Sequence, residues 1–270
     1  MALRDRRLTL ARPAGVRAGE FAWNALPVFT GVILLLLWEV GVRSKLPAYV
    51  ARPTTIAAAI PSVIVTAGFW SDMLSTCGAI VEGVAIGSIA GAVLGLLMGR
   101  VREVGWFFTP YIRGLYSLPL IALIPVLVLV VGYNDKTRMV VIILSAFLPV
   151  AMTTADGARA VSKSFLDVGR TFGAKPYQVW FGIAFPASLP HILAGIDIAL
   201  GRAFTSAVAV EVLASVPGLG YTLYADAQSL HDDVSFVYVV ALAAFAILVR
   251  TGVRSMSGRL APWYRPRARA

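Results

Sequence analysis

Six long apolar runs constrain this chain more than any other feature of its sequence. They cover residues 21–38, 83–99, 114–134, 139–155, 191–214 and 234–249. A helix that crosses a lipid bilayer needs roughly 20 mostly apolar residues, with a lower limit near 17. Five of the runs carry no charged residue, whereas the run at 191–214 contains Asp197, Arg202 and Glu211. The runs predict an all-α integral membrane protein with six transmembrane helices.

The placement of the basic residues predicts how these helices are oriented. The net charge is +10, yet only 14% of the residues are charged, against about a quarter in a soluble domain. If the N-terminus lies in the cytoplasm, six spans put 18 of the 24 Lys and Arg on the cytoplasmic side. The outer loop 215–233 then has none, and the outer loop before the fourth span holds Lys136 and Arg138. Cytoplasmic loops carry such an excess. We therefore expect both termini in the cytoplasm, and the positive charge does not indicate a nucleic-acid partner.

The same pattern divides the chain into three expected parts. An Arg-rich cytoplasmic N-terminus covers 1–20, the six-span domain covers 21–255, and a basic cytoplasmic tail covers 256–270. A cleavable signal peptide is the alternative for the first apolar run. Its removal would leave five spans and would place the outer loop without Lys or Arg and the basic tail on the wrong sides of the membrane.

The segment between the first two spans has two interpretations. Ile56, Ile60, Val63 and Ile64 recur at helical spacing among three prolines. They predict either a short interfacial helix on the outer face, with the rings that follow at the headgroup level, or an ordinary loop.

Glycines recur at a fixed interval in the second span. They are spaced four residues apart, at Gly83, Gly87, Gly91, Gly95 and Gly99. In a helix this spacing forms a narrow groove along one face, which lets another helix approach closely. We interpret these glycines as helix-packing residues. Prolines at 119, 125 and 149 predict kinks in the third and fourth spans.

A polar segment, "FLDVGRTFGAKPYQVWFGIAFP" at 165–186, interrupts the apolar pattern. It predicts a short cytoplasmic helix over 164–173, with a capping box at Ser164 and Asp167 and with Gly173 in the left-handed C-terminal position. A second helix should run from Pro176 to about Phe185, followed by a bend at two prolines, 186 and 190. Phe165, Val168 and Phe172 share one face of the first helix. They either meet another protein or pack beneath the chain's own helices.

The spacing of Asp167, Gly173, Ile183 and Pro186 resembles the EAA loop of permease subunits of ABC importers. The chain resembles that family over roughly 46–255, with "LPAYVARPTTI", "AGAVLGLLMGR" and "HILAGIDIALGRAFTSAVAVEVL" in the family's order. It looks most like the branch that transports nitrate, sulfonates, taurine and thiamine precursors. The family's Glu-Ala-Ala is Asp-Val-Gly here, at 167–169.

The resemblance implies a type I importer permease fold, located in the bacterial inner membrane, in which a coupling helix docks on a separate ATPase. The residues that it assigns to coupling are Phe165, Asp167, Val168, Arg170, Phe172, Gly173 and Pro186. It also implies a second permease copy, an extracytoplasmic solute-binding protein, and a small anion as substrate. The sequence contains no G-x-x-x-x-G-K-[ST] phosphate loop. We therefore expect ATP and Mg²⁺ on the partner ATPase and no cofactor on this chain.

Charged residues within a membrane span are costly, so they are candidates for function. As residues that line the translocation path, we select Ser145, Thr154, Thr205, Ser206 and Glu211. A pairing of Glu211 across a dimer interface is the alternative. Arg202 projects roughly opposite Glu211 on the helix, so we expect it to anchor to another helix or to the cytoplasmic boundary.

The sequence gives little support to an enzymatic function. His191 and His231 have no Cys or carboxylate at catalytic or metal-ligand spacing, and Cys77 is the only cysteine. Two alternatives to an importer subunit remain. One is an ion-gradient-coupled carrier that works alone, and the other is a membrane-embedded enzyme.

Overall fold

A computed structural model of the chain describes residues 15–44 and 50–260, and within these ranges every regular element is a helix. The chain divides into two compact units, 1–58 and 59–270. In chain order the helices are α1 (Gly15–Ser44), α2 (Pro53–Ile64), α3 (Ala67–Arg100), α4 (Arg102–Ser117), α5 (Leu120–Val131), α6 (Asp135–Ala160), α7 (Lys163–Thr171), α8 (Pro176–Val179), the π-helix η1 (Trp180–Ala184), α9 (Phe185–Leu213), α10 (Leu219–Gln228) and α11 (Asp232–Leu260).

The first unit contains α1, which covers the first expected span and starts six residues before it. Near its end, Glu39 accepts hydrogen bonds from the N–H and the hydroxyl of Thr54, at 3.2 and 3.0 Å, and pairs with Arg43 at 2.8 Å. Thr54 belongs to α2, which begins with proline at its first position. The helical interpretation of this segment is confirmed and the loop interpretation is wrong. Its place at the membrane interface stays a prediction.

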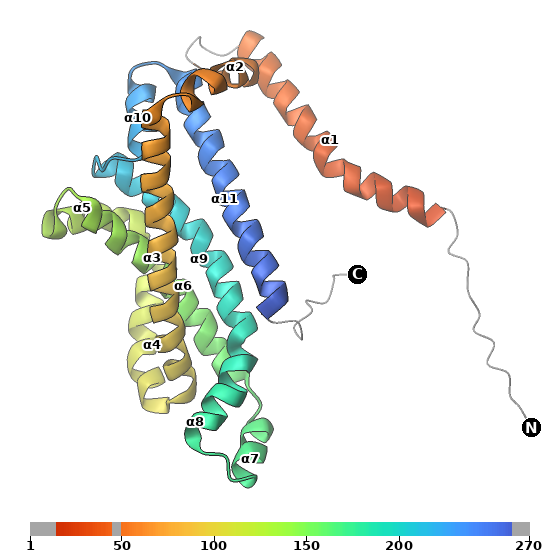
Figure 1. Cartoon of the computed structure of the whole chain (residues 1–270), viewed down its shortest axis with the longest axis vertical. Coiled ribbons are helices and arrows are strands. Elements are labelled where there is room, and N and C mark those ends of the chain that lie inside the picture. Colours follow the sequence, from red (N-terminus) through yellow and green to blue (C-terminus); the bar gives the residue numbers. More distant parts are fainter. Residues whose placement is uncertain (1–14, 45–49, 261–270) are drawn as a thin grey trace, which may run out of the picture. The chain divides into compact units, whose positions relative to one another are not determined.

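The second unit is built on three long helices that lie side by side. α6 packs against α3 along one face and against α9 along another (Figure 1). The buried core between them is aliphatic and contains Ile80, Val84, Ile142, Val150 and Ala203. α11 packs on α9, and α10 lies at the end of the unit opposite α7 and α8 (Figure 1).

The glycine series of α3 lies against α6. A Cβ atom at Gly87 would lie 2.5 Å from the carbonyl oxygen of Ile143, and one at Gly91 would lie 2.6 Å from that of Phe147. A Cβ atom at Gly95 would lie 2.5 Å from the carbonyl oxygen of Ala151. These distances are too short for any side chain. Because each successive glycine meets the next turn of α6, the two helices touch backbone to backbone over most of their length.

The expected third span, 114–134, is not one continuous helix, and the kink predicted at Pro119 is confirmed. Two helices, α4 and α5, meet there at a bend of 101°. The break falls at Leu118, which is extended (φ −76°, ψ 138°) and precedes Pro119. The residue before a proline is disfavoured in the α region, and the proline itself has no N–H to continue the ladder. Five of the described helices are long and apolar enough to cross a membrane, or six if the bent pair counts as one span.

The short helix in the polar segment begins one residue earlier than predicted. α7 starts at Lys163, and the N–H of Ser164 donates to the Ser162 hydroxyl at 3.3 Å. The predicted capping box at Ser164 is therefore wrong, because Ser164 already lies inside the helix. Gly173 has a φ of +75°, so its predicted left-handed conformation is confirmed.

The predicted bend at Pro186 and Pro190 is also wrong. The chain continues as one helical run from Pro176 to Leu213, through the π-helical turn η1. In that turn the N–H of Phe185 bonds to the carbonyl of Trp180, five residues back. In an α-helix the ring of Pro186 would clash with the carbonyl four residues before it. The wider π turn accommodates the proline without ending the helix. Pro149 likewise lies inside α6 without ending it.

Replacing Gly91 with Ala should destabilise the protein, because its Cβ meets the backbone of α6. We expect a loss of about 1–3 kcal/mol in the free energy of unfolding. Gly78→Ala is the matched control on the same helix, because nothing lies within 4 Å of a Cβ there. Thermal unfolding in detergent measures both. Equal midpoints for the two variants would contradict the close packing of α3 and α6.

A candidate cavity and a candidate coupling surface

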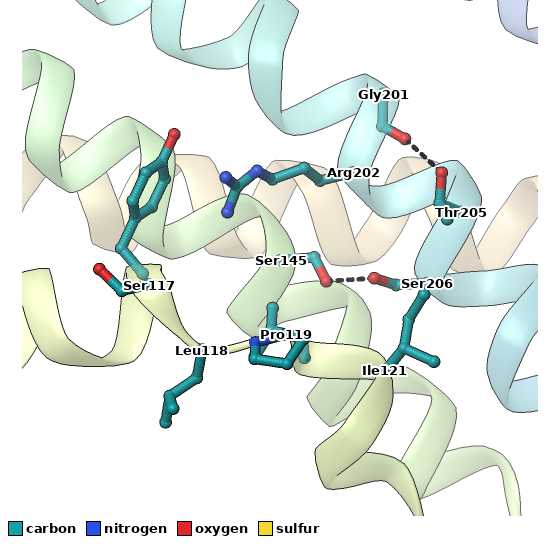
Figure 2. Close-up of a pocket in the computed structure, with 11 residues that line it drawn as sticks. Ser117, Leu118, Pro119, Ile121, Ser145, Gly201, Arg202, Thr205 and Ser206 are labelled. Atoms are coloured by element: carbon teal, nitrogen blue, oxygen red, sulfur yellow. Dashed lines mark hydrogen bonds between the residues drawn. The ribbon is translucent and has the colours of Figure 1, made fainter.

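A cavity of about 420 Å³ opens where α4 breaks away from α5. Figure 2 shows its walls, which are the corner between the two helices on one side and α6 and α9 on the other. It is lined by 116–121, Ser145, Gly201, Arg202, Thr205 and Ser206. The corner at Pro119 and the missing side chain at Gly201 both leave room for this space.

Two hydroxyl groups join α6 to α9 at this cavity. The Ser145 hydroxyl donates to the carbonyl of Val141 at 2.8 Å and lies 2.6 Å from the Ser206 hydroxyl (Figure 2). Both serines are buried. The Thr205 hydroxyl donates to the carbonyl of Gly201 at 3.1 Å (Figure 2). Three of the five residues selected for the path from the sequence, Ser145, Thr205 and Ser206, therefore line one cavity.

Arg202 also faces this cavity, and sequence reasoning did not place it on the path. Its guanidinium carbon lies 4.0 Å from the centre of the Tyr116 ring, so it anchors to α4, in line with the expected contact to another helix. One signal in the sequence could have identified it. Arg202 is a cation inside a membrane span, and a neighbouring span contains a proline that breaks its helix.

Glu211 lies in a different place, near the C-terminal end of α9. It is completely buried and pairs with Arg138 of α6 at 2.9 Å. The Thr76 hydroxyl of α3 donates to the same carboxylate at 2.8 Å, and the N–H of Gly220 donates to it at 2.8 Å. Arg138, which the topology had placed in an outer loop, belongs to α6 and is buried.

This cluster holds the turn between α9 and α10. Arg138 also donates to the carbonyl of Pro217 at 3.1 Å, and Thr76 accepts from the N–H of Leu219 at 2.9 Å. A Cβ at Gly218 would collide with the Glu211 carboxylate. Glu211 therefore pairs within its own chain and joins three helices to the turn. It does not line the cavity, and its place on the translocation path stays a prediction.

Thr154 is not at the cavity either. It is completely buried on α6, where a Cβ at Gly95 would lie 2.7 Å from its own Cβ. It lies within the tight contact between α3 and α6. The spacing of polar residues along a helix could not separate this packing position from a cavity position.

α7 presents an apolar surface outward. Phe165, Val168 and Phe172 are 67%, 54% and 86% exposed. Gly169 lies on the side of the helix that contacts the rest of the chain. A Cβ there would lie 3.0 Å from the Ile183 side chain. The aromatic face thus does not pack beneath the chain's own helices. We call Phe165, Val168 and Phe172 the α7 face.

The other residues assigned to coupling surround the α7 face. Asp167 is an exposed residue of α7, and Gly173 ends the turn that follows it. Pro186 lies half-buried in the first turn of α9. The side chain of Arg170 lies outside the described residues.

The family of this chain follows from comparison with known proteins. The model of a family described as the binding-protein-dependent transport system inner membrane component matches residues 83–266, more than half of the chain. The chain belongs to this family. The expected membership in the ABC importer permeases is thereby confirmed, and the chain is a transmembrane subunit of an importer.

Individual relatives agree with the family. The permease is 26% identical over 246 residues to the taurine transport system permease protein TauC of Escherichia coli, covering 88% of this chain and 90% of TauC. It is 25% identical over 254 residues to the putative aliphatic sulfonates transport permease protein SsuC of Bacillus subtilis, covering 93% and 91%. An inward-facing structure of the MetNI methionine ABC transporter superposes with a TM-score of 0.60 at 16% identity, over 71% of this chain and 95% of that one. This likeness shows a shared fold.

A second ion pair joins α9 to α11. Asp197 of α9 accepts two hydrogen bonds from Arg250 of α11, at 2.7 and 2.8 Å. Arg254 lies 3.8 Å from the same carboxylate. No group of three His, Cys, Asp or Glu that could hold a metal ion occurs among the residues described.

Glu211→Gln should strongly destabilise the permease, because it removes the only fully buried carboxylate that the structure shows paired with Arg138 and leaves that arginine with the exposed Asp135 alone. We expect a loss of about 3–5 kcal/mol in the free energy of unfolding. Asp135→Asn is the matched control, because Asp135 pairs with the same arginine at 2.7 Å but is 70% exposed. That change should cost less than about 1 kcal/mol. Thermal unfolding in detergent compares the two, and similar losses would contradict a structural role for the buried pair.

Proposed function

We propose that this permease forms the membrane path of an importer that is driven by ATP hydrolysis on a separate subunit. The observation that carries the proposal is the α7 face, which exposes two aromatic rings and a valine on a polar segment outside the long apolar helices. Exposed apolar groups of this kind mark protein interaction surfaces. The partner is an ATPase, to which family membership also points.

The α7 face has a direct mechanical connection to the cavity. α7 packs on the segment that begins the long helix, through Gly169 against Ile183, and a small apolar cluster with Val161 and Val179 lies beneath it. From Pro176 the helical run continues to Leu213 and passes the cavity on the way. A displacement of α7 by a closing ATPase would therefore move the cavity wall, which is what alternating access requires.

The path runs through the cavity, where Ser145, Thr205 and Ser206 contribute hydroxyl groups. The transported solute is a small anion, such as taurine, another sulfonate or nitrate. The taurine and sulfonate permeases that match nearly the whole chain support this substrate class. A second permease copy completes the path, and an outer solute-binding protein delivers the solute. Both termini lie in the cytoplasm, and ATP and Mg²⁺ bind to the ATPase alone.

Phe172→Asp should abolish association with the ATPase. Phe172 is 86% exposed, so the change leaves the permease fold intact but places a carboxylate in the contact. Burying an unpaired charge costs about 3–5 kcal/mol, which corresponds to a loss of more than tenfold in affinity. The measurement is the amount of P-loop ATPase that co-purifies with the tagged chain from its native cells in mild detergent.

Ser164→Asp is the matched control, because it adds the same charge to an exposed position of α7 outside the α7 face. It should recover as much ATPase as the unmodified chain. Equal recovery with Phe172→Asp would remove the α7 face from the contact. If the unmodified chain recovers no ATPase, the proposal fails and an ion-gradient-coupled carrier takes its place.

A further inference from the structure

Arg202 differs from Arg138 and Arg250, the two arginines that pair with the carboxylates of α9. Arg138 is neutralised by Glu211 at 2.9 Å, and Arg250 by Asp197 at 2.7 Å. In the part of the chain that the structure describes, no carboxylate lies within 4 Å of the Arg202 guanidinium. Arg202 is therefore a cation in a membrane span that has no counter-charge among the described residues.

The depth of Arg202 makes this arrangement costly. It lies eleven residues before the end of α9 at Leu213, about 16 Å along the helix axis. The facing Ser145 lies ten residues into the 26-residue α6. Both positions are well inside their helices, where an unpaired charge is expensive and is normally retained for function.

Arg202 contacts an aromatic ring of α4. Its guanidinium carbon lies 4.0 Å over the centre of the Tyr116 ring, whose π surface attracts the cation. A guanidinium carries five N–H donors. No described residue accepts a hydrogen bond from them, and Figure 2 shows the side chain extending across the cavity from α9.

Other groups around the cavity do not compensate the charge. The Ser145 hydroxyl has one proton, which it donates to a backbone carbonyl. Ser206 is then the donor in the bond between the two hydroxyls. Both hydroxyl protons are thus used within the protein. α4 ends and α5 begins on the same wall, so the opposite partial charges of two helix termini offset each other there. The net positive charge of the cavity is that of Arg202.

We propose that Arg202 binds the oxyanion group of the transported solute, a sulfonate, carboxylate or nitrate, inside this cavity. A guanidinium presents two parallel N–H groups that match two oxygens of such an anion, and Tyr116 holds it in position. A volume of about 420 Å³ accommodates a small organic anion. The inference rests on the proposed function, because it takes the cavity as part of the path.

The test is anion binding to the purified full chain in phosphatidylcholine nanodiscs, by isothermal titration calorimetry at constant ionic strength against chloride. The probes are ethanesulfonate, acetate and nitrate, with neutral ethanesulfonamide as the uncharged analogue. We expect saturable binding of at least one anion and none of the sulfonamide. Arg202→Gln should weaken that binding at least tenfold. Arg202→Lys keeps the charge without the two parallel N–H groups, so its affinity should lie between those of the unmodified chain and Arg202→Gln.

Lys136→Gln is the matched control, since it removes one exposed positive charge from α6 outside the cavity. It should bind the anion as the unmodified chain does. Size-exclusion profiles of all variants establish that they are folded. Equal weakening by Lys136→Gln would show a non-specific charge effect and would overturn the proposal.

Three further results would overturn it. One is that none of the three anions binds. Another is that phosphatidylglycerol in the nanodiscs abolishes binding, which would assign the cavity to a lipid phosphodiester. The third is that Arg202→Gln dissociates a permease dimer, which would assign the charge to a second copy. Anion binding is measured without nucleotide, so it does not depend on an ATPase. ATPase recovery in the same preparations tests the proposed function. Normal ATPase recovery with no anion binding would therefore overturn this inference and leave the proposed function intact.

Discussion

The backbone contact between α3 and α6 is the constraint on which the rest of the second unit depends. Because lipid is as apolar as a leucine side chain, helices in a membrane gain little from burying apolar surface and associate through close packing. The glycines from 83 to 99 provide that packing, and every one of them meets α6. α6 thereby becomes a fixed support, on whose other face α9 lies.

Charge is distributed along α9 on this support in a consistent way. Glu211 binds Arg138 near one end and joins the turn between α9 and α10 to α3 and α6. Asp197 binds Arg250 and joins the helix to α11. Between these two satisfied pairs lies Arg202, beside the corner of α4 and α5. Two pairs hold the helix, and the remaining cation faces open space, where a charged solute can supply the missing partner.

The helix content and the glycine contact could be predicted from the sequence, because both depend on local periodicity. The left-handed Gly173 was also predictable, since it follows from turn chemistry at one position. The partner of Glu211 was not, because Arg138 lies 73 residues away and was assigned to a loop by counting charges.

Prolines were the least predictable feature. Pro119 ends a helix with a bend of 101°, whereas Pro186 is absorbed by a π turn within one continuous helix. The local effect of the missing N–H is the same in both cases. The outcome differs with the surrounding packing, which a single sequence does not specify. The cavity could not be anticipated for this reason, since it exists only because α4 and α5 separate at Pro119.

The most direct test of the ATP-driven importer is a cryo-EM structure of the complex isolated from native membranes. We predict two permease copies with two P-loop ATPases, the α7 face in contact with an ATPase groove, and the Arg202 cavity open to a path between the copies. A chain that is isolated without a nucleotide-binding subunit, with the α7 face against lipid or against its own helices, would contradict an ATP-driven mechanism.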